Sequence, residues 1–346
     1  MRDYVRVLLA GLCYYSGLIK LVCYWTRRAG PRLIILNYHR AAGNTLRSHF
    51  LYLRHHYRIL PLEAALEELF TLGEEAKRRD RRTLLAITFD DGYYDNYSDA
   101  FGLACEVEVP VTIFLIPGYI ERSAHFWWLE GQRIVKYSQV QEALIEGNMY
   151  HLDREEERQA LIHLIETRLL HASSVAQREE WLSALRGTLQ VSETLTEDER
   201  LALPLTWEEV LEMEKSNWIS FGAHTMHHPV LSYLTDPAEL RFEVARCREV
   251  LEQRLGLSVC TFAYPLGKWE QIGDTVLAVV QQVGYRWAVT TLPGVNTAQT
   301  DPYLLRRRNV GVNQHWLTLA AETAGVWSFF SLLSRRLWAL MSQRNR

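Results

Sequence analysis

Cysteine is scarce in this chain, and its placement excludes two common uses of the residue. The five cysteines, an odd number, include no Cys-x-x-Cys pair, so neither a disulfide framework nor a cysteine-ligated zinc site is predicted. We expect free, buried thiols, which fit a reducing compartment or a cytoplasmic face.

The sequence also lacks a net basic charge. The formal net charge is −3 at pH 7, so nothing global points to a nucleic-acid partner. No internal repeat or low-complexity linker divides the 346 residues, of which 48% are apolar and 23% charged. The length allows one large globular domain, or two small ones, with a sizeable core.

A long uninterrupted apolar run is missing, even near the N-terminus. A spanning helix needs about 20 apolar residues, whereas the run Val7–Ile19 is shorter and is bounded by Arg6 and Lys20. No small-x-small cleavage site lies in the usual place, and the residues around Cys13 form no lipoprotein box, so a cleaved signal peptide is not favoured. Residues 1–30 better suit an amphipathic helix that lies on a membrane.

The C-terminal residues have a similar composition. In residues 321–346, aromatic and leucine side chains recur at roughly helical spacing and are accompanied by Arg335, Arg336, Arg344 and Arg346. This pattern predicts a basic amphipathic helix. Terminal helices that simply pack on the domain are the alternative, but we expect peripheral membrane contact through both ends.

Short apolar runs alternate with helical patterns along the rest of the chain. The runs predict buried strands at Leu33–Tyr38, Leu84–Phe89, Val109–Ile116, Ile219–Gly222, Thr261–Tyr264, Ala288–Thr291 and Asn309–Val312. Helices are predicted at Leu62–Leu72, Pro237–Leu255 and Asp274–Val283. This alternation indicates an α/β fold with a largely parallel sheet, either open or closed into a barrel. Residues 121–205, rich in Glu, Arg, Leu and Gln, predict a helical insertion within a domain spanning 31–320.

Two polar motifs follow the ends of predicted strands, where parallel sheets bind their ligands. Asp90-Asp91-Gly92 comes directly after one strand. Taken alone it could be an ordinary surface turn, because Asp-Gly is a common turn dipeptide. His224 and His228 follow another strand, at a spacing that puts both imidazoles on one face of a helix or tight turn. Two imidazoles and a carboxylate form an open site for a divalent ion such as zinc.

Three motifs resemble those of the NodB-type polysaccharide deacetylases, the fourth family of carbohydrate esterases. They are Thr88-Phe89-Asp90-Asp91-Gly92, His224-Thr225-Met226-His227-His228 and Phe262-Ala263-Tyr264-Pro265-Leu266-Gly267. The resemblance covers roughly residues 33–312. It implies a distorted barrel of seven β/α units carrying the helical insertion, and an enzyme that hydrolyses a linear amide C–N bond.

The resemblance also implies roles for individual residues. Asp90 corresponds to the catalytic base, and Asp91, His224 and His228 correspond to the metal ligands. The backbone N–H of Tyr264 corresponds to a donor that helps to hold the oxyanion, and Arg307 to the arginine that positions the base.

One departure concerns the general acid. Many members of the family supply it from a Leu-x-His segment near the C-terminus, which is absent here. Leu36-Asn37-Tyr38-His39 resembles the opening of a branch that supplies the acid from the N-terminal side. The resemblance therefore implies His39 as the acid, with His315 as the runner-up.

The expected substrate is an N-acylated, most simply N-acetylated, aminosugar in a polysaccharide or on a lipid carrier. The expected cofactor is Zn²⁺, although Co²⁺, Ni²⁺ and Mn²⁺ suit the same ligands. Together with the two terminal helices, the expected substrate predicts a membrane-associated enzyme on the cytoplasmic face of a bacterial inner membrane. Two alternatives stay open: an amidohydrolase acting on a small non-sugar C–N bond, and an inactive membrane-tethered carbohydrate-binding protein.

Overall fold

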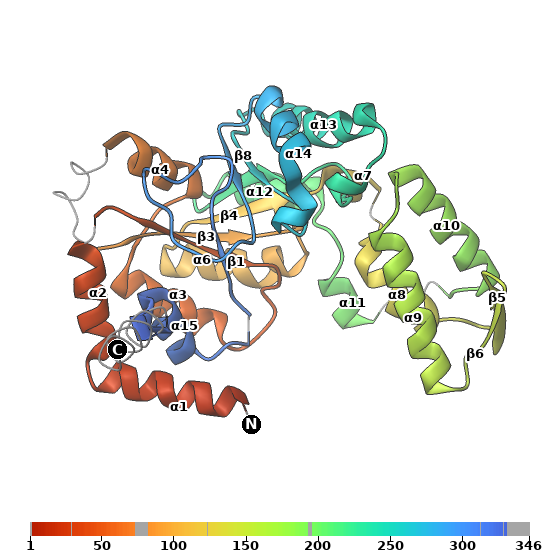
Figure 1. Cartoon of the computed structure of the whole chain (residues 1–346), viewed down its shortest axis with the longest axis horizontal. Coiled ribbons are helices and arrows are strands. Elements are labelled where there is room, and N and C mark those ends of the chain that lie inside the picture. The colour runs from red at the N-terminus through yellow and green to blue at the C-terminus, as the bar shows by residue number, and fades with distance from the viewer. Residues whose placement is uncertain are drawn as a thin grey trace, which may run out of the picture.

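A curled parallel sheet forms the centre of the protein (Figure 1). The computed structural model describes residues 2–28, 30–72, 82–122, 124–192, 196–311, 313–327 and 329–330. The strands run in the order β10 (Arg308–Asn309), β1 (Leu33–Tyr38), β3 (Leu84–Phe89), β4 (Val111–Leu115), β7 (Ile219–Ala223), β8 (Thr261–Ala263) and β9 (Trp287–Val289), with β2 (Arg58–Ile59) beside β3. Every pairing in this sheet is parallel, as the alternation of strands and helices predicted.

The segment before β10 connects the two edges of the sheet. Leu305 donates to the carbonyl of Ala288 (3.0 Å), and its own carbonyl accepts from the N–H of Thr290 (2.8 Å), both next to β9. Leu36 of β1 then pairs with Arg308. An irregular segment rather than a regular strand therefore bridges the edges, which confirms a distorted β/α barrel.

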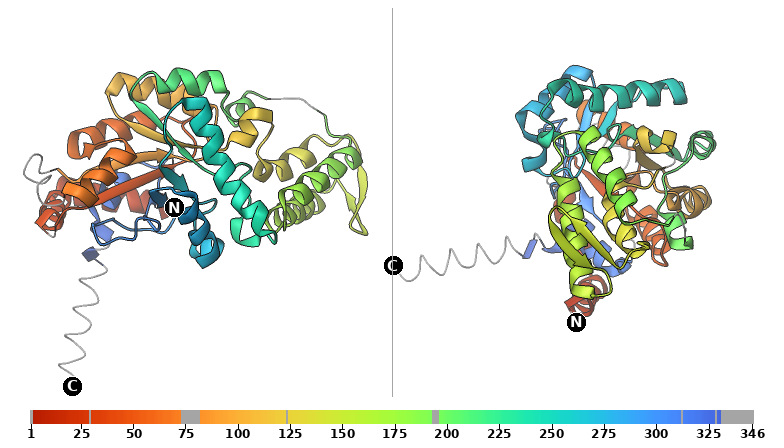
Figure 2. Two further views of the ribbon diagram at one scale, coloured as in Figure 1. Left: turned by 90° about the horizontal axis from the view of Figure 1, so that it is seen from above. Right: turned by 90° about the vertical axis from the view of Figure 1, so that its right-hand side faces the viewer.

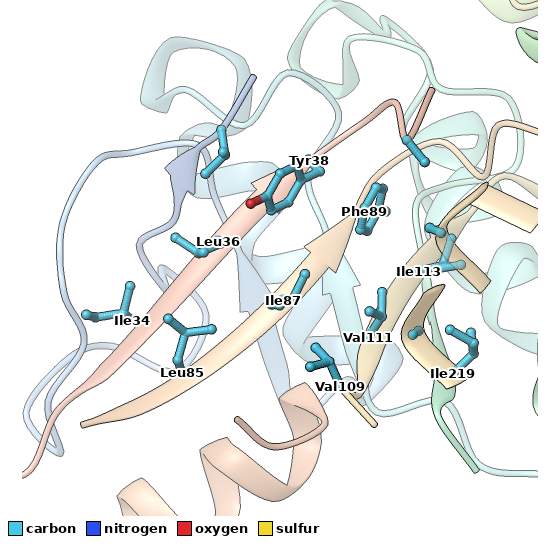
Figure 3. Close-up of a cluster of buried hydrophobic side chains, with 14 of the residues drawn as sticks. Ile34, Leu36, Tyr38, Leu85, Ile87, Phe89, Val109, Val111, Ile113 and Ile219 are labelled. Carbon is cyan, nitrogen blue, oxygen red and sulfur yellow. The ribbon is translucent and has the colours of Figure 1, made fainter. Parts of the chain in front are cut away.

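Neighbouring strands divide their side chains between two cores. Ile34, Leu36 and Tyr38 of β1 point to the same face as their partners Leu85, Ile87 and Phe89 of β3 (Figure 3). The alternate residues belong to a second core, which strands β1, β3, β4, β8 and β9 share with helix α4 (Leu62–Glu67): Leu33, Ile35, Leu84, Ala86, Phe114, Ala263, Trp287 and Val289. Both faces are buried, which explains why β1 and β3 are continuous apolar runs.

Helices surround the sheet, and their ends follow local capping signals. They include α3 (Leu46–His56), η1 (Glu68–Leu72), η2 (Asn96–Phe101), α6 (Gly102–Val107), α7 (Pro117–Arg122), α12 (Trp207–Glu214), η3 (Leu231–Tyr233), α13 (Pro237–Leu255), α14 (Trp269–Val283) and α15 (Trp316–Ala324). The Asp236 carboxylate accepts from the Ala238 N–H at the start of α13, and Gly256 ends the helix at φ 69°. Gly273, at φ 63°, interrupts α14 just before the predicted start at Asp274.

Residues 127–201 form a lobe beside the barrel (Figures 1 and 2). It contains α8 (Trp127–Lys136), α9 (Glu155–Leu170), α10 (Val175–Thr188) and α11 (Glu197–Leu201). It also contains an antiparallel hairpin that the sequence analysis missed, made of β5 (Glu142–Ile145) and β6 (Asn148–His151). The apolar core of the lobe is distinct from the two cores of the barrel, but it also includes Tyr93, Ile116 and Tyr119, which follow strands β3 and β4.

Two N-terminal helices pack under the barrel. Helices α1 (Arg2–Tyr15) and α2 (Leu18–Arg28) meet at a bend of 73°. Tyr14 packs edge-to-face on Trp316 of α15, at 5.1 Å between ring centroids. Within the described residues no single helix has both the length and the apolar character needed to cross a membrane, although this bent pair meets the two criteria together.

The cysteines and the C-terminal segment were also subjects of prediction. All five cysteines are free, as expected, with Cys13 and Cys247 buried and the other three half-buried. The predicted C-terminal helix at 321–346 falls mostly outside the described residues, since α15 ends at Ala324 and residues 331–346 are not described.

Candidate active site

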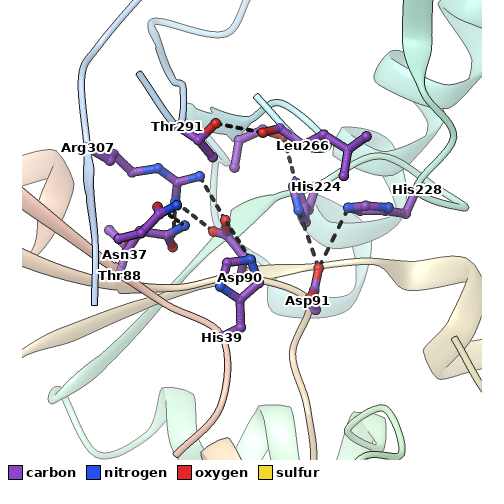
Figure 4. A network of polar contacts seen from close by, with 12 residues as sticks. Asn37, His39, Thr88, Asp90, Asp91, His224, His228, Leu266, Thr291 and Arg307 are labelled. Carbon is purple, nitrogen blue, oxygen red and sulfur yellow. Dashed lines mark hydrogen bonds and ion pairs between the residues drawn. The ribbon is translucent and has the colours of Figure 1, made fainter. Parts of the chain in front are cut away.

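Asp91, His224 and His228 converge at the carboxyl ends of β3 and β7. The Asp91 Oδ1 atom lies 3.5 Å from Nε2 of His224 and 3.7 Å from Nε2 of His228, and all three side chains are buried (Figure 4). One ligand atom from each residue fits within a span of 4.8 Å. The two histidines are joined by a tight turn rather than a helix, with Thr225 at φ 66° and His228 at φ 51°.

The spacing of these atoms fits a tetrahedral metal site. Zinc lies about 2.0–2.2 Å from nitrogen and oxygen ligands, so the edges of its tetrahedron measure roughly 3.4 Å. The separations of 3.5 and 3.7 Å are near that value and too long for good hydrogen bonds. Three protein ligands would leave a fourth position open for water or substrate, as in catalytic zinc sites.

The surroundings of His228 and Asp91 favour the forms that bind metal, whereas the contacts of His224 with Asp91 and Asp90 outweigh burial and raise its pKa. Burial and the nearby His224 lower the pKa of His228 to about 3, which keeps its ring neutral. Burial alone would raise the pKa of Asp91, but its contacts with His224, His39 and His228 outweigh burial and lower it. Nδ1 of His224 contacts the carbonyl of Ala263 at 2.7 Å, which leaves Nε2 free as the ligand atom.

Asp90 is held by the fully buried Arg307. The guanidinium donates two parallel hydrogen bonds to the carboxylate, each 2.7 Å long, and the same group bonds to Asn37, Thr88 and the carbonyl of Thr290 (Figure 4). Burial would raise the pKa of Asp90, but the charge of Arg307, with smaller contributions from His224 and His39, holds the pKa well below its usual range. The carboxylate is therefore ionised and fixed in direction, as a general base requires.

His39 lies at the open side of Asp90. Its Nε2 atom is 4.0 Å from Oδ2 of Asp90, and its side chain is 47% exposed, so substrate and solvent can reach it. The Asn96 amide donates to the His39 carbonyl at 3.1 Å, and Arg40 pairs with the buried Asp95 at 2.6 Å. These contacts hold the segment after β1 against the loop that follows Asp91.

His315 is placed elsewhere. Its Nδ1 atom accepts from the N–H of Leu317 at 3.2 Å and caps the start of α15, and its ring stacks on Trp316. Among the described residues it has no contact with Asp90, Asp91, His224 or His228. The geometry therefore favours His39 over His315 as the candidate acid.

The N–H of Tyr264, the predicted oxyanion donor, has a partner within the sheet. Its N–H donates to the carbonyl of Val289 at 3.2 Å, as part of the pairing between β8 and β9, so this group is engaged in the sheet. Two residues later Leu266 has a positive φ of 59°, and no acceptor for its N–H occurs among the described residues. Its carbonyl is held by the Thr291 hydroxyl at 2.6 Å. The N–H of Leu266 is therefore the more available donor of the two.

Comparison with known proteins decides the family. The family model for polysaccharide deacetylases matches residues 77–288, more than half of the chain, and this span contains Asp90, Asp91, His224 and His228. The chain belongs to the polysaccharide deacetylase family. It is thus a hydrolase that acts on amide bonds, as the sequence predicted.

Individual relatives of this deacetylase are distant in sequence. It is 24% identical to YxkH of Bacillus subtilis (strain 168), a protein provisionally named a polysaccharide deacetylase, over 297 residues covering 83% of this chain and 74% of YxkH. Two solved structures have a similar fold. The Streptococcus pyogenes deacetylase PplD in complex with acetate has a TM-score of 0.54 at 19% identity, covering 84% of this chain and 97% of PplD. IcaB from Ammonifex degensii has a TM-score of 0.53 at 21% identity, with the same coverage.

In this deacetylase, side chains of the lobe of residues 127–201 contact the turn that carries the histidines. The Trp127 indole N–H donates to the carbonyl of His228 at 2.9 Å. Arg178, also buried, donates to the carbonyl of His227 at 2.9 Å. The Trp128 ring lies against the His228 imidazole, at 4.4 Å between centroids. No sequence motif pointed to Arg178, because its partner is a backbone carbonyl far away in the chain.

Two other residues in or next to the motifs have structural roles. His227 is turned away from the three candidate ligands and pairs with the buried Glu243 at 2.7 Å. Tyr93, an aromatic residue near the motif, is buried, and its hydroxyl accepts from the Trp128 indole at 2.7 Å. Both residues therefore make structural contacts next to the site.

Proposed function

We propose that this polysaccharide deacetylase removes the N-acetyl group of an aminosugar with the help of a divalent ion, most simply Zn²⁺, held by Asp91, His224 and His228. The observation that carries the proposal is the convergence of these three ligand atoms next to an ionised Asp90. When bound, such an ion lowers the pKa of a coordinated water and polarises the acyl oxygen.

The chain's own residues would supply the remaining steps. Asp90 takes a proton from the attacking water, whose oxygen bonds to the acyl carbon, and Arg307 keeps the carboxylate ionised and correctly aimed. The Leu266 N–H donates to the oxyanion that develops on the acyl oxygen. His39 then gives a proton to the sugar nitrogen as the C–N bond breaks. Acetate and a free amine are the products.

We further propose that the enzyme works at a membrane, on a sugar carried by a lipid. Exposed apolar residues run along one face of α1, with Tyr4, Leu8, Leu12 and Tyr15 between 68% and 80% exposed. Residues 4–28 contain Arg6, Lys20, Arg27 and Arg28 but no acidic residue. An apolar face flanked mainly by positive charges, with Asp3 the one acidic residue of the two helices, suits an anionic lipid surface. The free cysteines fit the cytoplasmic leaflet.

A panel of substrates tests the function. Purified protein would be incubated with N-acetylated aminosugars in lipid-linked and in polymeric form, and the products analysed by mass spectrometry. We expect loss of the acetyl group, fastest on the lipid-linked sugars, and none with Asp91→Ala. A faster reaction on the polymers would refute the lipid-linked substrate but not the deacetylase. Reaction only on small non-sugar amides, or none at all, would refute the proposed activity on sugars.

A further inference from the structure

A hollow of about 200 Å³ lies between α2 and α3, away from the active site. Ile19, Tyr14 and Tyr52 contribute its apolar walls. Lys20, Arg27 and His56 contribute positive or titratable groups, and no carboxylate lines it. The described chain thus encloses a small space with cationic groups on one side and aromatic rings on the other.

The arginines at this hollow have no acidic partner. Arg27 makes one long hydrogen bond, 3.4 Å, to the His56 carbonyl, and its Nε atom is buried without a partner. Arg32, which does not line the hollow but interacts electrostatically with Cys23, Tyr57 and Arg27 of its lining, also has a buried Nε without a partner. Neither forms an ion pair with a described carboxylate, whereas the buried Arg307 and Arg178 of the active-site region both do. Buried donors without acceptors are costly, so this arrangement suits a bound acceptor.

The local electrostatics agree with the geometry. Burial lowers the pKa of Arg32, and the neighbouring charge of Arg27 adds to this effect. Burial also lowers the pKa of His56, with further lowering by His55, Lys20 and Arg27. Positive groups therefore repel one another at this place, and a bound anion would relieve the repulsion.

We propose that the hollow between α2 and α3 binds a phosphate group, with Arg27 and Lys20 as its principal contacts. Guanidinium and ammonium groups are the usual protein partners of phosphate. Leu21, Tyr24 and Trp25 are exposed on the same helix, which places apolar contacts beside the phosphate site. A phospholipid offers both features, and free phosphate offers the first.

This site is separate from catalysis. Arg32 precedes β1 and His39 follows it, and the six residues of the strand span about 20 Å. A phosphate at the hollow would therefore anchor or orient the enzyme rather than take part in the reaction. The lipid source of the phosphate rests on the membrane-docking part of the proposed function, whereas the phosphate site itself does not.

Two arginines that are neighbours in sequence give a matched test. Arg27→Gln and Arg28→Gln remove the same charge from the same helix, but only Arg27 lines the hollow. Binding of the full chain would be measured by co-sedimentation with vesicles of phosphatidylcholine, alone or mixed with phosphatidylglycerol in equal parts. Loss of one charge near an anionic surface weakens binding about fivefold, which is the effect expected for Arg28→Gln. Arg27→Gln should weaken it about fiftyfold, since charge-assisted hydrogen bonds are lost as well.

A second arm distinguishes the two sources of phosphate. Inorganic phosphate should raise the Tm of the wild type and of Arg28→Gln, but not that of Arg27→Gln. If the two variants differ only in the effect of phosphate on Tm, the site binds free phosphate. If they differ in vesicle binding, it binds a lipid head group. Equal behaviour of both variants in both arms would overturn the proposal. Lys20→Gln, at an exposed position of the same hollow, provides the same comparison if Arg27→Gln fails to fold.

Discussion

Arg307 and Asp90 form a buried ion pair joined by two parallel hydrogen bonds. The carboxylate receives two hydrogen bonds from the guanidinium, and Asn37, Thr88 and the Thr290 carbonyl accept three more bonds. Breaking such a pair leaves an uncompensated buried charge. The pair therefore fixes both the protonation state and the direction of the proposed base.

Replacing this arginine should change the pH dependence of the reaction. Arg307 holds the pKa of Asp90 below its usual range, and the base is inactive when protonated. In Arg307→Lys the pKa of Asp90 should rise, so the acid limb of kcat/KM should move to higher pH. The exposed Arg306, next in the chain, supplies the control variant Arg306→Lys. An unchanged acid limb in Arg307→Lys would show that Asp90 is not the titrating base.

The choice between the two candidate acids can be tested directly. His39→Gln should lower kcat by about a hundredfold or more, because protonation of the leaving amine is lost. Its metal content should not change, since His39 is not among the candidate ligands. His315→Gln should leave kcat near the wild-type value. The reverse result would place the acid at His315, in conflict with the geometry described above.

The positions of the site residues were predictable from sequence where a side chain is involved. Asp90, Asp91, His224 and His228 lie together as expected, because their motifs follow the carboxyl ends of strands in one parallel sheet. The engagement of the Tyr264 N–H was not predictable, because the availability of a backbone N–H depends on strand pairing. The partner of that N–H is Val289, on the neighbouring strand β9.

Among the elements, the buried strands were the most predictable. Strands β1 and β3 begin and end where the apolar runs do, since burial on both faces leaves a continuous signal. The β5–β6 hairpin was missed, because each strand has only four residues and the alternation of buried and exposed positions in β5 is too short to stand out. The two-residue turn of the hairpin, Glu146-Gly147, has positive φ at both residues, and this dipeptide was the sequence signal that could have predicted the hairpin.

The contacts between the lobe and the turn that carries His224 and His228 should influence metal affinity. Trp127→Phe removes the hydrogen bond to the His228 carbonyl and keeps the aromatic ring. Because such outer contacts orient metal ligands, zinc affinity should fall by about tenfold or more. Competition with a chelator measures this effect. Trp181→Phe, in α10 of the same lobe, is the control and should bind zinc like the wild type. Equal affinities in all three proteins would contradict the proposed coupling.

At the scale of the whole molecule, the fold leaves an apolar face uncovered. Leu8 and Leu12 lie one helical turn apart on the outer side of α1, where no described element packs on them. Leu144 and Met149, on the hairpin of the lobe, are similarly exposed but lie far from the terminal helices. The exposed pair on α1 and the exposed pair on the hairpin are therefore alike in chemistry and differ in location.

This contrast gives a test of membrane docking. The double variant Leu8→Ser/Leu12→Ser should lose most of its binding to anionic vesicles, because the removed side chains supply the apolar contact with lipid. Leu144→Ser/Met149→Ser should bind like the wild type. Equal loss in both double variants would indicate nonspecific adhesion, and no loss in either would exclude the α1 face as the docking surface.

The central claim is that deacetylation requires one metal ion held by Asp91, His224 and His228. Its most direct test is a titration of metal-free enzyme with Zn²⁺, with acetate release and bound metal measured in the same samples. Acetate release should rise from near zero and level off at one ion per chain. Asp90→Asn should bind the ion but release almost no acetate, and Asp91→Ala should do neither. Full activity in the metal-free enzyme, or in Asp91→Ala, would contradict the account.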